Sequence, residues 1–118
     1  RDEKEAIGLE ELSPIIDSLI REFPGLAFVL FGSRTKGSNR AWSDFDIGVC
    51  HSDQLPLSEF LKVVAAKDNL ADDFPAEIQL VNLNNAQSNF LKEICKTWRF
   101  LGGSMTAFLA IEKEAHDS

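Results

Sequence analysis

The sequence predicts an α/β domain in which a small sheet packs against helices. Apolar residues recur at helical spacing in some stretches and gather in short runs bounded by turn residues in others, and the two patterns alternate along the chain. The 118 residues are enough for one hydrophobic core and leave little room for a second. We therefore expect a single domain over residues 1–118, with its core at about 9–101 and a C-terminal tail at 104–118.

One helix and two strands are predicted over residues 9–50. Helical spacing is seen at Leu9, Leu12, Ile16, Leu19 and Ile20, and Pro24-Gly25 ends this helix. Ser13-Pro14 also fits a helix start, because proline suits the first turn, so the regular part is expected to begin at residue 9 or only at Ser13. Residues 26–31 form an apolar run typical of a buried strand, and 44–50 form a second strand with two carboxylates at its near end.

A further helix is predicted to begin at Pro56, and residues 76–83 form a third predicted strand. Asn84, with Gln87 three residues on, resembles a capping box that begins the next helix. This helix is expected to continue to Gly102-Gly103, with Trp98 on its apolar face. On the same helix we expect a solvated stripe formed by Lys92, Lys96 and Arg99.

The tail at 104–118 has the pattern of a short amphipathic helix. Its apolar residues are Met105, Phe108, Leu109 and Ile111, and charged residues follow them. Two interpretations of these residues remain open at this stage. They either close the hydrophobic core or form a face that binds a partner protein.

Charge and composition exclude several classes of protein. The net charge of −7 argues against direct nucleic-acid binding, which needs a basic surface. No apolar run approaches the roughly 18 residues that a membrane-spanning helix needs. Cys50 and Cys95 are too few for a disulfide framework and suggest buried thiols of a cytoplasmic protein.

Asp44 and Asp46 are the first candidate site residues. They are two positions apart in a predicted strand, so both side chains are expected on one face. Two carboxylates that point the same way repel each other unless a cation lies between them. Mg²⁺ prefers such oxygen ligands and shares them with phosphate oxygens, so the pair predicts a metal site. Taken alone, the pair favours a solvated strand end over a metal site.

The segment before this pair has features of a phosphate-binding loop. Gly32 directly follows a predicted strand and allows the backbone to approach a phosphate, while Ser33 adds a hydroxyl and an N–H. Arg34, Lys36 and Arg40 place cations in the same loop of an acidic protein. A polar connection with turn glycines is the alternative. We favour a triphosphate site because strand end, Gly-Ser, basic loop and Asp-x-Asp occur in the order that this chemistry needs.

The two segments Gly-Ser-Arg-Thr-Lys-Gly at 32–37 and Ser-Asp-Phe-Asp-Ile at 43–47 resemble the core of the DNA-polymerase-β-type nucleotidyltransferases. The resemblance covers residues 9–101, and the small size points to the minimal nucleotidyltransferase (MNT) subgroup. It implies a mixed sheet flanked by helices, the nucleotidyltransferase fold. It also implies Mg²⁺-dependent transfer of a nucleoside monophosphate, usually AMP from ATP, to a hydroxyl acceptor. Asp44 and Asp46 would be metal ligands, and Gly32 and Ser33 would contact the triphosphate.

The family also uses a third carboxylate on the later strand, and here the chain departs from the pattern. The matching position is Gln79, and a neutral amide can ligate through oxygen but is a poor base. Glu77 is two residues earlier, so on a regular strand it points to the same face. Either Glu77 completes the site or activity is weak or lost.

The resemblance also suggests a partner. Minimal nucleotidyltransferases are often encoded beside a small helical HEPN-type protein, and in such pairs they act as antitoxins that can AMPylate a tyrosine of a toxic ribonuclease. The first functional hypothesis is therefore a nucleotidyltransferase that modifies a partner protein. A weak or inactive nucleotide-binding antitoxin is the second. A small-molecule enzyme of the aminoglycoside type is the third, and the short chain disfavours it.

Overall fold

The computed structural model describes residues 8–32 and 44–117. Its elements, in chain order, are α1 (Leu9–Glu22), β1 (Leu26–Phe31), β2 (Phe45–His51), α2 (Leu57–Leu70), β3 (Ile78–Asn82), the 3₁₀ turn η3 (Leu83–Asn85), α3 (Ser88–Ile94), β4 (Arg99–Gly103) and α4 (Met105–Asp117). The four strands form one sheet in the order β3-β2-β1-β4. β1 is antiparallel to both of its neighbours, whereas β2 and β3 are parallel. The predicted α/β fold with a small mixed sheet is confirmed.

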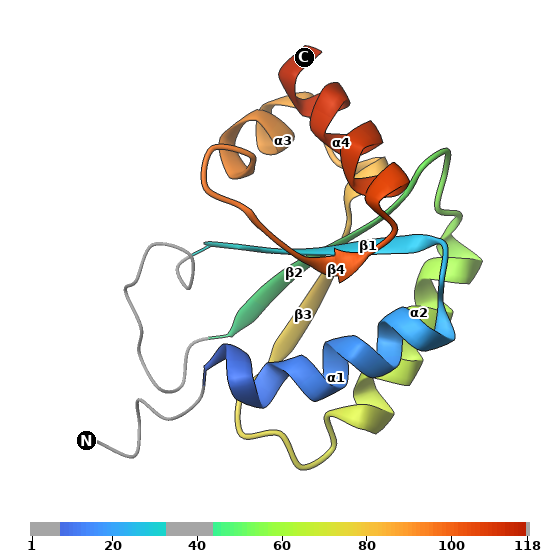
Figure 1. Ribbon diagram of the computed structural model, residues 1–118, viewed down its shortest axis with the longest axis vertical. Coiled ribbons are helices and arrows are strands. Elements are labelled where there is room, and N and C mark those ends of the chain that lie inside the picture. The colour runs from blue at the N-terminus through green and yellow to red at the C-terminus, as the bar shows by residue number, and fades with distance from the viewer. Residues whose placement is uncertain (1–7, 33–43, 118) are drawn as a thin grey trace.

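The helices cover the sheet in two layers (Figure 1). α1 and α2 lie on one face, and α3 and α4 lie on the other. We call these the α1/α2 face and the α3/α4 face. The central strand β1 is buried on both sides, because Phe28 and Leu30 pack toward the α1/α2 face while Val29 and Phe31 pack toward the α3/α4 face. This explains why residues 26–31 are a continuous apolar run rather than an alternating one.

Helix α1 begins at Leu9 rather than at Ser13, so the later of the two predicted starts is wrong. Gly8 provides the physical reason. Its N–H donates a 2.7 Å hydrogen bond to the carboxylate of Glu11, and its carbonyl accepts from the backbone of Glu11 and Leu12. Pro14 therefore lies inside the helix and does not mark its boundary.

The long helix predicted up to Gly102-Gly103 is wrong. Helix α3 ends at Ile94, and residues 99–103 form the edge strand β4, which pairs antiparallel with β1. The free edge of β1 supplies hydrogen-bond partners that no local pattern reveals, and this pairing outweighs the helical spacing. Arg99 consequently belongs to a strand, and the predicted three-cation stripe on one helix does not form.

Two side chains from this region have roles different from those predicted. Trp98 does pack, but it lies between α3 and β4 and contacts Phe108 of α4, with ring centroids 5.8 Å apart. Asn84 does not cap α3, whose first residue follows Gln87 with no side-chain cap. Instead its amide group accepts a 2.7 Å hydrogen bond from the N–H of His51 and donates one of 3.0 Å to the carbonyl of the same residue.

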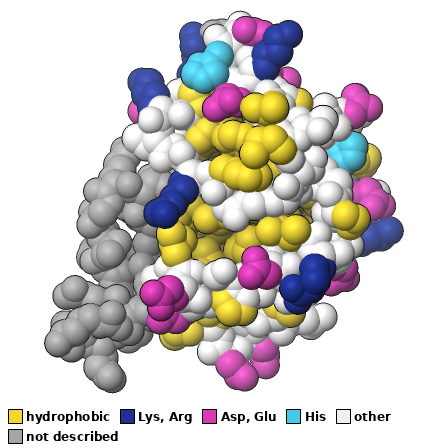
Figure 2. Space-filling view, in the orientation of Figure 1, with side chains coloured by type: hydrophobic (Ala, Val, Ile, Leu, Met, Phe, Trp, Pro, Cys, Tyr) yellow, Lys and Arg dark blue, Asp and Glu magenta, His cyan; other side chains and the backbone are white. Residues whose placement is uncertain are grey.

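The predicted tail helix is confirmed as α4, and it closes the hydrophobic core, while a partner-binding face on it stays a prediction. Ile111 and Ala107 are buried against the sheet, whereas Met105 and Leu109 are 52% and 54% exposed. Figure 2 shows apolar side chains gathering at the surface on the side of the molecule that carries α4 and β4. Within the described residues, no helix is both long and apolar enough to span a bilayer.

Candidate active site

The acidic pair lies at one end of the sheet, where β2 begins beside the end of β1. Phe45 and Ile47 pack into the core of the α1/α2 face, so Asp46 between them points to the α3/α4 face. The register places Asp46 opposite Phe31 of β1 and opposite Gln79 of β3. Asp44 comes directly before the strand. We call Gly32, Asp44, Asp46 and Gln79 together the acidic site.

Electrostatics links the two carboxylates as predicted. The pKa of Asp46 is raised above its ordinary value, first because the group is partly buried and second because of the negative charge of Asp44. The protein therefore holds two carboxylates close together at a free-energy cost. A cation placed between them would remove that cost, and carboxylate oxygens are the ligands that Mg²⁺ prefers.

Gly32 lies against the carboxylate of Asp46. Its φ of +88° is in the left-handed region, and a Cβ added at this position would stand 2.6 Å from Oδ2 of Asp46. Glycine is therefore required here for two reasons: the backbone conformation disfavours other residues, and there is no space for a Cβ. The close approach brings the backbone at the end of β1 next to Asp46, one of the two candidate metal ligands.

Gln79 contacts the site directly. Its Nε2 donates a 2.8 Å hydrogen bond to Oδ2 of Asp44. The amide group consequently occupies the β3 side of the acidic site, where the resemblance implied a third carboxylate. The sequence places Gln79 at this position but contains no signal for its bond to Asp44, which depends on the parallel register of β2 and β3.

Glu77 lies at the rim of the acidic site. It comes just before β3, its side chain is exposed, and its carbonyl accepts a 2.8 Å hydrogen bond from the N–H of Phe45, the residue between the two aspartates. Within 8–32 and 44–117 there is no group of three His, Cys, Asp or Glu side chains arranged to hold a metal. The structure thus brings Asp44 and Asp46 together and leaves the Glu77 side chain outside such a group.

The remaining predicted phosphate contacts, Ser33, Arg34, Lys36 and Arg40, lie outside the described residues. One neighbour of the acidic site was missed. The ring of Phe90 on α3 packs edge-to-face against Phe31, the register partner of Asp46. Its position became visible only when the helix was placed on the sheet.

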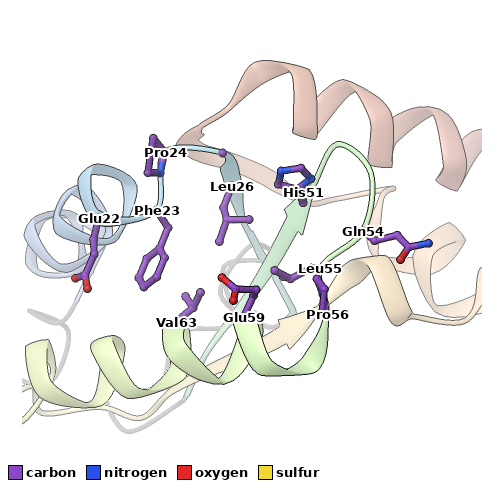
Figure 3. A pocket seen from close by; sticks show the side chains of 11 residues that line it. Glu22, Phe23, Pro24, Leu26, His51, Gln54, Leu55, Pro56, Glu59 and Val63 are labelled. Atoms are coloured by element: carbon purple, nitrogen blue, oxygen red, sulfur yellow. The ribbon is translucent and has the colours of Figure 1, made fainter.

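A separate cavity of about 330 Å³ lies at the opposite end of the sheet (Figure 3). Phe23, Leu26 and Val63 form its apolar wall between α1 and α2, and Glu59 and His51 lie at its rim. Leu26 and His51 are register partners at the far end of the β1–β2 ladder from Phe31 and Asp46. This cavity is therefore not part of the acidic site.

Comparison with protein families gives one match, over residues 14–102, to the family described as "Polymerase beta, Nucleotidyltransferase". This range contains the whole acidic site and covers most of the chain. No similar sequence was found among curated proteins.

Several solved structures have a similar fold. A toxin–antitoxin complex with AMP-PNP is 25% identical with a TM-score of 0.66, over 89% of this chain and 82% of that chain. A mutant MntA–HpeT toxin–antitoxin complex is 26% identical with a TM-score of 0.62, over 86% and 78% of the two chains. A complex of tri-AMPylated Shewanella oneidensis HEPN toxin with MNT antitoxin is 20% identical with a TM-score of 0.62, over 89% and 81%, and supports the fold alone.

Proposed function

The chain belongs to the polymerase beta nucleotidyltransferase family, and we propose that it transfers AMP from ATP to a hydroxyl group of a partner protein. The observation that carries this proposal is the contact of Gly32 with Asp46 beside Asp44. It combines a backbone that can approach phosphate with two carboxylates that can hold Mg²⁺. This is the pair of functions that nucleotidyl transfer requires.

Each site residue has a proposed role. Asp44 and Asp46 hold Mg²⁺, which would neutralise the triphosphate of ATP. Gly32 and Ser33 contact the phosphates through their backbone, while Arg34 and Lys36 offset the remaining negative charge in a protein whose net charge is −7. In the reaction the acceptor oxygen bonds to the α-phosphorus, the bond from that phosphorus to the bridging oxygen breaks, and pyrophosphate leaves.

Glu77 is proposed to receive the proton of the acceptor hydroxyl. Its backbone is hydrogen-bonded to Phe45, between the two aspartates, and its exposed side chain is free of the core. Glu77→Gln should then lower the rate of transfer while the affinity for Mg²⁺–ATP stays close to that of the wild type. Loss of nucleotide binding in this variant would instead make Glu77 a ligand of the metal.

The partner is proposed to be a HEPN-type toxin, with this chain as its antitoxin in the cytoplasm. Support comes from the similar structures, which include a toxin–antitoxin complex with AMP-PNP at 25% identity. An AMP group added to the partner would be a covalent and charged modification that can block the partner's own active site. Mixing the two proteins with ATP and measuring the toxin's activity tests this role.

The proposed activity can be tested with labelled ATP, Mg²⁺ and a candidate partner. Wild-type protein should label the partner, and the variants Asp44→Asn and Asp46→Asn should each reduce labelling by about a hundredfold or more, which is the scale of losing one group that stabilises charge in the transition state. Asp53→Asn is a matched control, because Asp53 is an exposed aspartate that follows the far end of β2. Labelling that survives both site variants would overturn the proposed site.

A binding-only antitoxin is the second candidate function. The hydrogen bond from Gln79 to Asp44 favours it, because an amide fills the position of the third carboxylate and cannot act as a base. Under this alternative, Gln79→Asp should create or strongly raise transfer activity. Under the first proposal, in which Glu77 acts, the same change should have little effect on the rate.

A further inference from the structure

The acidic site borders a group of aromatic side chains on the α3/α4 face. The register places Gln79, Asp46 and Phe31 side by side across β3, β2 and β1. Side chains of paired residues share a face, so one half of this row is polar and the other half is aromatic. Phe90 of α3 extends the aromatic half, since its ring centroid lies 5.6 Å from that of Phe31 at an interplanar angle of 87°.

Phe90 is much more exposed than the two residues that anchor α3 to the sheet, so the packing of this helix does not depend on burying its ring. The helix is anchored by Leu91 and Ile94, which are 1% and 8% exposed, whereas Phe90 is 37% exposed. A perpendicular contact with Phe31 covers one edge or one face of the Phe90 ring and leaves a ring face uncovered by it. A rigid helix thus presents an accessible aromatic surface one side chain away from Asp46.

From this arrangement we infer that Phe90 is the surface on which the base of the bound nucleotide stacks. The inference rests on the proposed function, because it takes the triphosphate to lie at Gly32, Asp44 and Asp46. With the phosphates held there, the base extends either toward the polar half of the row or toward the aromatic half. Among the described residues of this row, only the aromatic half offers a flat apolar group, and stacking on such a group suits a nucleobase.

Stacking predicts affinity for the base without strong selection among bases. Every nucleobase has a π face, so the contact from Phe90 should strengthen ATP and GTP binding to similar degrees. Any preference for adenine would then come from groups other than Phe90. The alternative occupant of the ring is an aromatic side chain of the acceptor protein, and the experiment below separates the two.

The test compares two ligands that share a triphosphate but differ in the base. Isothermal titration calorimetry measures the affinity of the whole chain for Mg²⁺–AMP-PNP and for Mg²⁺–tripolyphosphate, which has no base. Wild-type protein should bind AMP-PNP about tenfold more tightly than tripolyphosphate, a ratio within the range expected for one stacked base. Phe90→Leu keeps an apolar contact to Phe31 but removes the π face. It should therefore bring the ratio of the two affinities close to one and leave tripolyphosphate binding unchanged.

Matched variants complete the design. Phe90→Trp should keep or increase the ratio, because a larger ring stacks more strongly. Leu61→Ala should not change it, since Leu61 is a 52% exposed apolar residue on α2, on the other face of the sheet. Asp46→Asn should weaken the binding of both ligands. For the Phe90 and Leu61 variants, retained tripolyphosphate binding also shows that the protein is folded.

The outcomes are distinguishable. If neither ligand binds the wild type, the proposed function fails and this inference falls with it. If both ligands bind and Phe90→Leu leaves the ratio of their affinities unchanged, the inference is wrong while the proposed function stands. The inference is also overturned if Phe90→Leu lowers partner labelling with no effect on AMP-PNP affinity, because the ring would then serve the acceptor protein.

Discussion

The side-chain amide of Gln79 donates a 2.8 Å hydrogen bond to Oδ2 of Asp44 and so ties the edge strand β3 to the residue that precedes β2. The bond has two consequences. It neutralises part of the repulsion at the acidic site without adding a charge, and it occupies one oxygen that a metal would use. We expect the balance between these effects to set how strongly the protein responds to Mg²⁺.

Gln79→Asp should make the protein more dependent on Mg²⁺. The change removes the hydrogen bond and adds a third carboxylate, so like charges repel in the metal-free protein and a cation gains a ligand. We expect a lower unfolding temperature without metal and a rise on adding Mg²⁺ that exceeds the wild-type rise by several degrees. Thermal unfolding followed by circular dichroism measures both. Gln79→Ala is the control, since it loses the bond but adds no charge, and an equal Mg²⁺ response in both variants would contradict the prediction.

Gly32→Ala should weaken both the fold and the acidic site. At a φ of +88° an alanine is strained by roughly 1–2 kcal/mol. Its Cβ would also press on Oδ2 of Asp46, so that carboxylate must move. Urea unfolding should show the loss of stability, and calorimetry should show weaker Mg²⁺–AMP-PNP binding. Gly8→Ala is a suitable control, because a Cβ there meets only an oxygen of Glu11 at an ordinary 3.7 Å. Unchanged nucleotide affinity in Gly32→Ala would argue against this residue as a phosphate contact.

Asp46→Asn should stabilise the metal-free protein near neutral pH. The pKa of Asp46 is raised by burial and by Asp44, so the folded state holds this proton more tightly than the unfolded chain, whose ordinary pKa is 3.8. The contribution of Asp46 to the free energy of unfolding of the wild type therefore increases as pH falls from neutral through the raised pKa. The advantage of Asp46→Asn should shrink over the same range, as urea unfolding at several pH values would show. Asp53→Asn serves as the exposed control, and an advantage that grows on acidification would be the opposite of what we expect.

The two thiols should differ sharply in reactivity. Burial raises the pKa of Cys50 to about 12, which leaves almost no thiolate near neutral pH, and its Sγ is fully buried. Cys95 is only partly buried at the end of α3. An aromatic disulfide reagent should therefore modify one thiol in the native protein and both in urea. Cys95→Ser should remove the native reaction, and rapid native labelling of Cys50 would mean that the α3/α4 face opens readily.

Local patterns were sufficient for most elements of the fold. The continuous apolar run at 26–31 predicted a buried strand, and β1 is buried on both sides, as expected for a strand with no polar face. Edge strand β4 could not be predicted in this way. Its two adjacent residues Phe100 and Leu101 pack on opposite faces of the sheet, and that alternation exists only because β1 lies beside them.

The sequence by itself determined the acidic site as a set of residue types in a fixed order, since Gly32 directly follows one strand and Asp44 and Asp46 lie at the start of the next. Only the tertiary structure decided what surrounds them. The register of β2 with β3 brings Gln79 onto Asp44, and the packing of α3 brings Phe90 onto Phe31. The physical reason is that strand pairing and helix packing bring together residues that are far apart along the chain. Local spacing does not encode which of these distant side chains come into contact.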